Sequence, residues 1–124
     1  MKPKILLVDD EPGVCEVDSY YLAKRGYNII TANTAKEAIS KVVKDRPQLV
    51  LLDILMPEMD GLRCLEEIKK INKDLPVIMV TCVDEIETAK KALEIGAVDY
   101  ITKPLGYKAL ETAISLYLFL KTTK

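Results

Sequence analysis

The chain of 124 residues contains no histidine and only three cysteines. The absence of histidine excludes general acid–base catalysis by imidazole, and it excludes any metal site built on imidazole ligands. The cysteines, Cys15, Cys64 and Cys82, are odd in number, scattered, and without a CxxC pair. This pattern favours reduced thiols in a cytoplasmic protein, and we expect two of the three to be small packing residues.

Long hydrophobic runs and an excess of one charge are also missing. No apolar run approaches the roughly 18 residues of a membrane span, and Ile5–Val8 is too short an apolar run for a signal peptide. The 18 basic and 19 acidic side chains leave a net charge of −1, which gives no electrostatic footprint for nucleic acid or an anionic membrane. With 49% hydrophobic residues, the length fits one domain over residues 1–124.

Short apolar runs alternate with segments of helical apolar spacing. The runs predict strands at about 4–9, 27–32, 49–54, 76–81 and 98–102. Four of these runs are rich in Val, Ile and Leu without polar alternation, which is typical of strands buried on both faces. The intervening segments predict helices at about 12–25, 34–45, 61–72, 84–95 and 106–121.

Helix punctuation agrees with these bounds. Thr34 and Glu37 have the spacing of a capping box, and Gly26 and Gly96 lie where helices would end. Five βα units predict an α/β fold with one doubly wound parallel sheet, and the chain length favours the flavodoxin-like order 2-1-3-4-5. Ligands of such sheets bind at the carboxyl ends of the strands, between strands 1 and 3.

Acidic residues follow two of the expected strands. Asp9 and Asp10 end the first, in "ILLVDDEP", and Asp53 ends the third, in "LVLLDILMPEMDG". Neighbouring strands lie about 4.8 Å apart, so the three carboxylates would converge and repel one another. A hard divalent cation removes this conflict, and oxygen ligands suit magnesium. The sequence therefore predicts a Mg²⁺ site beside a potential nucleophile.

Two further strand ends carry groups suited to phosphate. Thr81 ends "VIMVT" with a hydroxyl, and Lys103 follows "DYIT" with an ammonium group. A carboxylate can act as a nucleophile toward phosphorus, and phosphoryl transfer requires mainly positioning and charge neutralisation. Singly, each residue has an ordinary explanation, such as a solvated turn acid, a strand residue or a surface charge. The joint pattern is far more specific.

The ordered motifs "LLVDDEP", "LVLLDILMPEMDG", "VIMVT" and "GAVDYITKP" give the chain a clear likeness. Over essentially its whole length it resembles the receiver domain of two-component response regulators. The resemblance implies a signalling module, not a turnover enzyme, that catalyses its own phosphorylation and dephosphorylation. Asp53 would take a phosphoryl group from a histidine kinase. Mg²⁺ would be held by Asp9, Asp10, Asp53 and the backbone carbonyl of Leu55.

The resemblance also implies a switch. Thr81 would move toward the phosphate, Lys103 would bind a phosphate oxygen, and the bond before Pro104 would be cis. Tyr100 would couple its rotamer to Thr81, although an ordinary strand aromatic is the alternative explanation. A local charge change would then bias a two-state element. The surface of the fourth helix, fifth strand and fifth helix would carry the output to a partner, an output domain or a second copy.

Three residues depart from the family pattern or tune it. Cys82 stands where the family usually has Ala, Ser or Gly; we expect it to be tolerated, and its thiol could sense oxidation. Leu55 and Val83 occupy positions that influence the lifetime of the phosphate in the family. Both are apolar and cannot orient an attacking water, so we expect a long-lived phosphoryl group on Asp53.

The last expected helix is more apolar than one buried stripe requires. Its core face would carry Leu110, Ala113, Ile114 and Tyr117. Phe119 projects roughly opposite and Leu116 to the side. This surface is either a site for a partner or a frayed, sticky end. The chain is either a free-standing receiver or the front of a longer regulator.

Three other functions compete with this interpretation. A magnesium-dependent phosphohydrolase of the haloacid-dehalogenase type would carry DxD after the first strand, where this chain has "DDE". A degenerate receiver that is never phosphorylated would lack some of the five matching side chains, and all are present. A flavin-binding flavodoxin-like protein would want a Ser/Thr/Gly-rich phosphate loop where this chain has acids.

Overall fold

A computed structural model describes residues 2–56, 59–103 and 106–122. Strands and helices alternate through these residues: β1 (Lys4–Val8), α1 (Pro12–Lys24), β2 (Asn28–Ala32), α2 (Ala35–Asp45), β3 (Leu49–Leu52), α3 (Gly61–Ile71), β4 (Val77–Thr81), α4 (Ile86–Ile95), β5 (Asp99–Thr102) and α5 (Tyr107–Thr122). All strand pairs are parallel, in the order β2-β1-β3-β4-β5. The predicted fold class and strand order are confirmed. The expected cis bond before Pro104 lies outside the described residues.

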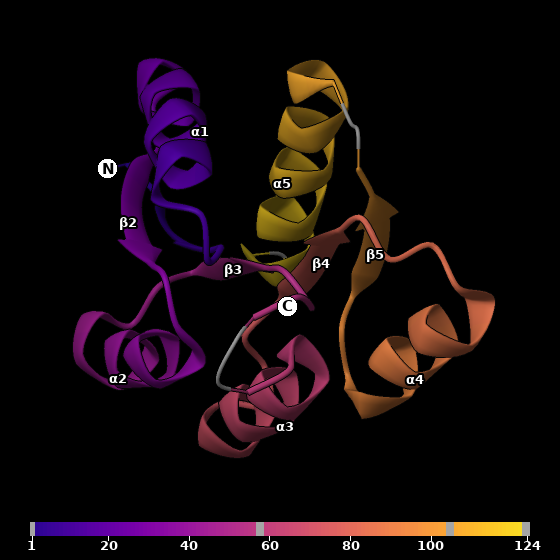
Figure 1. Cartoon of the computed structure of the whole chain (residues 1–124). Helices are drawn as coiled ribbons and strands as arrows, with labels where there is room; N and C mark the ends of the chain where they lie inside the picture. Colours follow the sequence, from indigo (N-terminus) through magenta and orange to yellow (C-terminus); the bar gives the residue numbers. More distant parts are fainter. Residues whose placement is uncertain (1, 57–58, 104–105, 123–124) are drawn as a thin grey trace.

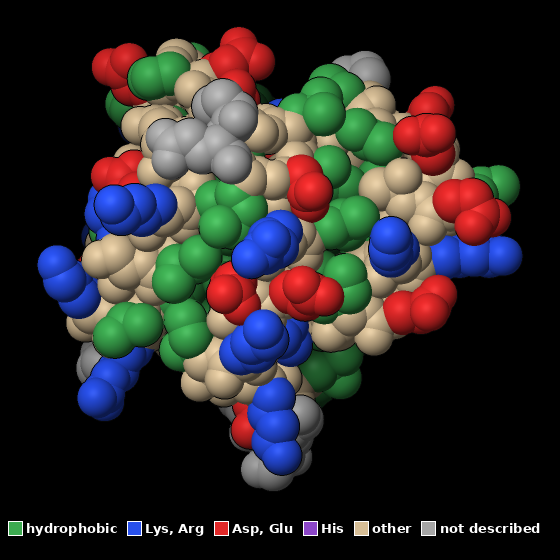
Figure 2. All heavy atoms as spheres, turned by 60° about the horizontal axis from the view of Figure 1, so that its bottom comes forward, with side chains coloured by type: hydrophobic (Ala, Val, Ile, Leu, Met, Phe, Trp, Pro, Cys, Tyr) green, Lys and Arg blue, Asp and Glu red, His purple; other side chains and the backbone are tan. Residues whose placement is uncertain are grey.

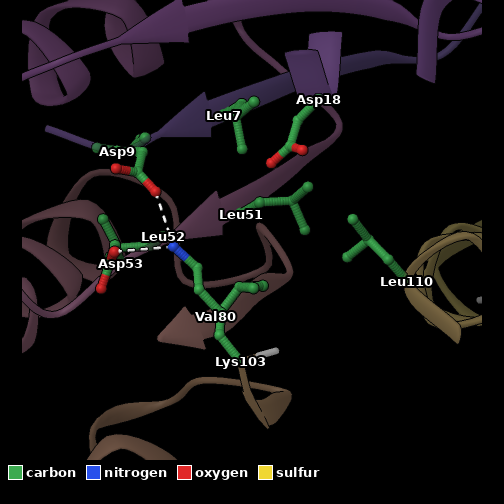
Figure 3. A pocket seen from close by; sticks show the side chains of 10 residues that line it. Leu7, Asp9, Asp18, Leu51, Leu52, Asp53, Val80, Lys103 and Leu110 are labelled. Atoms are coloured by element: carbon green, nitrogen blue, oxygen red, sulfur yellow. Dashed lines mark hydrogen bonds and ion pairs between the residues drawn. The ribbon is translucent and has the colours of Figure 1, made fainter. Parts of the chain in front are cut away.

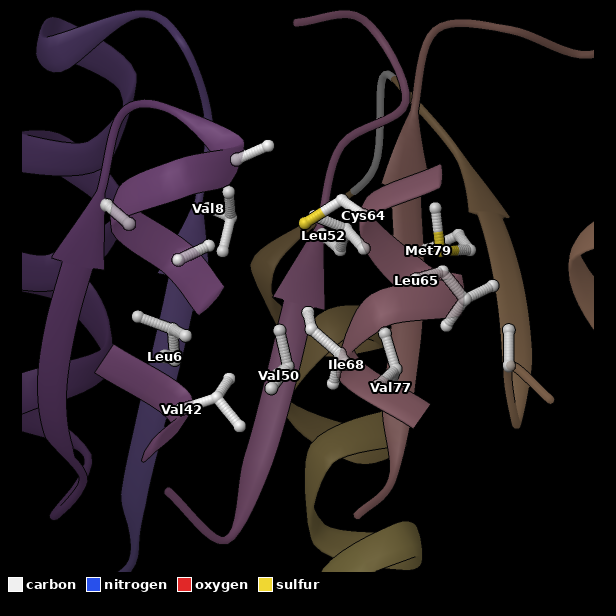
Figure 4. Close-up of a cluster of buried hydrophobic side chains, with 14 of the residues drawn as sticks. Leu6, Val8, Val42, Val50, Leu52, Cys64, Leu65, Ile68, Val77 and Met79 are labelled. Carbon is white, nitrogen blue, oxygen red and sulfur yellow. The ribbon is translucent and has the colours of Figure 1, made fainter. Parts of the chain in front are cut away.

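The helices cover both faces of the sheet, with α1 and α5 on one side and α2, α3 and α4 on the other (Figure 1). On the latter side, aliphatic residues of the central strands meet those of the helices in one buried cluster. Figure 4 labels its main members, which are Leu6, Val8, Val42, Val50, Leu52, Cys64, Leu65, Ile68, Val77 and Met79. β3 is buried along its whole length, whereas β2 and β5 at the sheet edges are only partly buried. Continuous apolar runs thus mark the strands that helices cover on both faces.

The helix ends carry the predicted capping residues and glycines, with one difference in the hydrogen bonds at the start of α2. The Thr34 hydroxyl accepts a hydrogen bond from the Glu37 N–H at 3.1 Å. The Glu37 carboxylate, however, accepts from the N–H of Asn33 at 2.7 Å, one residue before the N-cap. Gly26 and Gly96 follow helices with φ of 96° and 131°, a backbone conformation that favours glycine.

The loop after β3 is closed by a tight backbone contact at Gly61. Its N–H donates to the carbonyl of Ile54 at 2.8 Å. A Cβ at this position would lie 2.3 Å from the carbonyl oxygen of Asp53 and 2.4 Å from the Cα of Ile54. Only glycine fits there without displacing backbone, so the start of α3 fixes where Asp53 leaves the strand.

The burial of the three cysteines and of the two faces of α5 agrees with what the sequence predicts. Cys15 and Cys64 are buried packing residues, and burial raises the pKa of the Cys64 thiol to about 12. Cys82 is exposed. In α5, Ile114 is fully buried, whereas Leu116 is 49% exposed and Phe119 is 62% exposed, which confirms the predicted faces.

The outer surface over α2, α3 and α4 mixes charges of both signs with hydrophobic side chains (Figure 2). This pattern agrees with the near-zero net charge. Within the described ranges, no helix combines the length and apolar character needed to cross a membrane.

Candidate functional site

Strand register brings the predicted acids together. β1 and β3 are neighbours with Val8 opposite Leu52, and the N–H of Asp53 donates to the carbonyl of Val8 at 3.2 Å. Asp9 and Asp53 therefore leave the sheet side by side. Carboxylate oxygens of Asp9, Asp10 and Asp53 all lie within 4.8 Å of one another. Asp9 and Asp53 are only 3% and 7% exposed, whereas Asp10 faces solvent.

Lys103 reaches between two of these acids (Figure 3). Its ammonium donates to Oδ2 of Asp9 at 2.9 Å and to Oδ2 of Asp53 at 3.2 Å. Burial of the ammonium opposes its charge, but the hydrogen bond that it donates to Asp9 and the negative charges of both acids outweigh this effect. The pKa of Lys103 is therefore raised above its ordinary value.

Backbone donors hold the remaining oxygens. Oδ1 of Asp9 accepts from the N–H of Glu11 at 3.0 Å, and Oδ1 of Asp53 accepts from the N–H of Leu55 at 3.1 Å. Each buried carboxylate is thus bound by the Lys103 ammonium on one oxygen and by a main-chain amide on the other. Such contacts fix the orientation of both groups.

The end of β4 is coupled to β5 beside this cluster. Thr81 is fully buried, its hydroxyl accepts from the N–H of Val83 at 3.3 Å, and its carbonyl accepts from the N–H of Lys103 at 2.7 Å. The Tyr100 hydroxyl donates to the carbonyl of Val83. Burial, followed by the charges of Glu85 and Asp53, raises the pKa of Tyr100. Tyr100 is thus packed inward and bonded to the loop that follows Thr81.

The donor set fits a magnesium ion. Three carboxylates and one ammonium leave two formal negative charges, which a divalent cation would balance. All three acidic ligands offer oxygen, the donor that magnesium prefers. Beneath the cluster, a cavity of about 20 Å³ is bordered by Asp9, Asp53, Lys103 and Asp18. It has room for about one water molecule and not for a metabolite.

Some neighbours of the site were not predicted from the sequence. The side-chain amide of Asn33 donates a hydrogen bond to the backbone carbonyl of Asp9 at 2.9 Å, and the Cys15 thiol lies 3.6 Å from the same oxygen. The Tyr107 hydroxyl donates to Asp18 at 2.7 Å, which raises the pKa of Tyr107 to about 12. An acid in mid-helix was the available signal for Asp18, whereas Asn33 had none beyond its place after β2.

The protein is a doubly wound α/β sheet in which a cluster of acidic side chains, able to hold a cation, lies at the carboxyl ends of β1 and β3. This is the point in the strand order at which such sheets bind their ligands. The chain belongs to the response regulator receiver domain family, whose sequence pattern matches residues 5–115. It is therefore a module of two-component signalling. Family membership also decides against the phosphohydrolase and the flavin-binding protein considered from the sequence.

Known relatives support this assignment over most of the chain. The transcriptional regulatory protein ZraR of Escherichia coli is 40% identical over 110 residues, which cover 89% of this chain and 25% of the relative. The alkaline phosphatase synthesis transcriptional regulatory protein PhoP of Bacillus subtilis is 34% identical over 118 residues, covering 95% and 49%. The chain thus spans about a quarter to a half of the length of these relatives.

Solved structures agree with the fold over nearly the full chain. A CheY-like receiver domain protein from Methanospirillum hungatei superposes with a TM-score of 0.96 at 31% identity, covering 99% of this chain and 98% of that one. NtrX from Brucella abortus superposes with a TM-score of 0.92 at 35% identity, covering 99% of this chain and 28% of that one.

Proposed function

We propose that residues 1–124 form one cytoplasmic receiver domain that accepts a phosphoryl group on Asp53 from a phosphohistidine of a histidine kinase. The observation that carries this proposal is the placement of Asp53. Asp53 is only 7% exposed, and its carboxylate lies beside those of Asp9 and Asp10 and accepts a hydrogen bond from Lys103. A carboxylate held in this way has an oriented oxygen for attack and a cation ready for the incoming charge.

The transfer balances with the groups present. A carboxylate oxygen of Asp53 forms a bond to phosphorus while the bond between phosphorus and the donor imidazole nitrogen breaks. The electron pair of that bond stays on the imidazole, which takes up a proton from solvent. Lys103, already 3.2 Å from Asp53, turns its ammonium to a phosphoryl oxygen and so neutralises part of the added charge.

Asp9, Asp10, Asp53 and the backbone carbonyl of Leu55 are the residues that would hold Mg²⁺. When bound, the ion supplies charge neutralisation at the phosphoryl oxygens. The residues themselves contribute orientation, because amides of Glu11 and Leu55 fix one oxygen each of Asp9 and Asp53. The apolar neighbours Leu55 and Val83 offer no group to orient an attacking water, which supports a slow loss of the phosphoryl group.

Phosphorylation would act on the loop after β4. The added phosphoryl group carries close to two negative charges and several strong acceptor oxygens. The Thr81 hydroxyl, now bonded to the amide of Val83, would turn toward it and release that amide. Because Tyr100 is bonded to the carbonyl of Val83, this shift reaches β5 and the surface of α4, β5 and α5. That surface would bind an output domain, a partner protein or a second copy.

The test is the mass of the intact protein after incubation with magnesium and acetyl phosphate. We expect the parent to gain one phosphoryl group and Asp53→Asn to gain none. Asp74→Asn, the same change at an exposed turn, should behave as the parent. Omission of magnesium should abolish the gain. An unmodified parent under conditions in which magnesium binds would support the degenerate receiver and contradict this proposal.

A further inference from the structure

The peptide unit between the two adjacent acids is held in place by side chains from outside their loop. The carbonyl oxygen of Asp9 accepts from the Asn33 amide at 2.9 Å and from the Cys15 thiol at 3.6 Å. The same Asn33 amide lies 3.5 Å from the Cys15 sulfur. Because the peptide group is planar, fixing this carbonyl also fixes the direction in which the chain continues to Asp10.

Asn33 is itself restrained from helix α2. Its N–H donates to the Glu37 carboxylate at 2.7 Å, and Glu37 pairs with Lys41 at 3.4 Å. The hydrogen bond from Asn33, opposed by burial and aided by Lys41, lowers the pKa of Glu37, so this acceptor is ionised at neutral pH. Lys41 also donates to the carbonyl of Thr31 in β2. A connected set of hydrogen bonds therefore runs from α2 through Asn33 to the backbone of Asp9.

We infer that Asn33 is a positioning residue for the acidic pair and sets the affinity of the protein for magnesium. This inference rests on the magnesium site of the proposed function. Asp10 is exposed, and its carboxylate oxygen lies within 4.8 Å of those of Asp9 and Asp53, so the direction of its backbone decides where this carboxylate lies. Groups that orient metal ligands typically contribute a factor of about 10–100 in metal affinity.

The experiment is a calorimetric titration of magnesium into the whole chain, with thermal unfolding of the metal-free protein alongside. We expect Asn33→Ala to weaken magnesium binding about tenfold. Cys15→Ala should weaken it less, because the thiol is the longer and weaker donor. Asn28→Ala, an exposed asparagine at the other end of β2, is the matched control and should bind as the parent.

The two measurements separate positioning from general stability. A merely structural role would lower the unfolding temperature of metal-free Asn33→Ala and leave the dissociation constant of its folded state unchanged. That result would overturn the inference alone. A parent that binds no magnesium would overturn both the metal site of the proposed function and this inference. Weakened binding in a variant with near-parental unfolding temperature would support it.

Discussion

The two ends of the parallel sheet differ sharply in what they bury. At the carboxyl ends of β1, β3 and β4 lie Asp9, Asp53 and Thr81, the buried polar or charged side chains of the described part of the chain. At the amino ends, main-chain hydrogen bonds close the strands, as between Asn28 and Pro3 at 2.8 Å. One end thus carries groups whose burial opposes folding unless they are paired, and the remainder of the sheet supplies apolar burial that offsets it.

This comparison implies that the core can be weakened without removing the chemistry. Ile68→Ala leaves a cavity where α3 meets the sheet, and we expect it to lower the free energy of unfolding by about 2–5 kcal/mol. Ile71→Ala, in the same helix but 43% exposed, should cost clearly less. Urea unfolding measures both. The folded fraction of Ile68→Ala should still gain a phosphoryl group. If it did not, the apolar core and the acidic end of the sheet would not be separable.

Gly61→Ala tests the joint between the two regions. The new methyl group would meet the backbone of Asp53 and Ile54, so we expect a loss of about 1–3 kcal/mol and a slower phosphorylation of Asp53. Gly13→Ala in α1 is the matched control, because nothing lies within 4 Å of its Cβ position. The control should be neutral or slightly stabilising. Equal unfolding curves for both variants would contradict the close contact.

Lys103→Met tests how the acids are kept buried. Without magnesium, it should lower stability by about 1–2 kcal/mol, discounted because the Lys103 side chain is 25% exposed. Saturating magnesium should reduce this difference in stability between Lys103→Met and the parent. The pKa of Lys103 is raised in the folded state, so its contribution is fully present below the ordinary lysine pKa of about 10.4 and is lost only above it.

Unfolding of the parent and Lys103→Met at several pH values gives the measurement. The difference in stability should stay constant from neutral pH to about 10 and shrink at higher pH. A difference that vanished already near neutral pH would show that the ammonium does not stabilise the two carboxylates.

The smallest effect is expected on the exposed side of α5. Leu116→Ser should change stability by at most about 0.5 kcal/mol, because the side chain is 49% exposed. Ile114→Ser, two residues earlier and fully buried, is the contrasting variant. If the exposed face of α5 binds a partner, Leu116→Ser should weaken the binding of the phosphorylated domain to that partner, or its self-association measured by sedimentation. The same variant should still gain one phosphoryl group.

The sequence predicted those features that local patterns determine. Short apolar runs predicted the strands, and segments of helical apolar spacing predicted the helices, to within two residues of the bounds observed. Asp9, Asp10 and Asp53 were predicted to meet because parallel strands end at one edge and β1 neighbours β3.

Contacts between distant elements were harder to predict. Asn33, after β2, reaches Asp9, and Glu37 bonds Asn33 in place of the N-cap amide. Both depend on the path of the loop, which residue type alone does not specify. The close approach of Gly61 to Asp53 was missed for the same reason. Lys103 was expected to bind phosphate, and its bridge between Asp9 and Asp53 follows from charge once they are adjacent.

The strand order has a consequence for the time course of folding. β1 is an interior strand, paired with β2 on one edge and with β3 on the other. On the ribosome, β3 follows β1 by the interval from Val8 to Leu49, which takes roughly 2–8 s at ordinary synthesis rates. During this interval, the edge of β1 that will pair with β3 is open to other chains, and Asp53 is not yet beside Asp9. The pairing of β3 with β1 therefore brings the acids together, whereas Lys103 joins them only after β5 has been made.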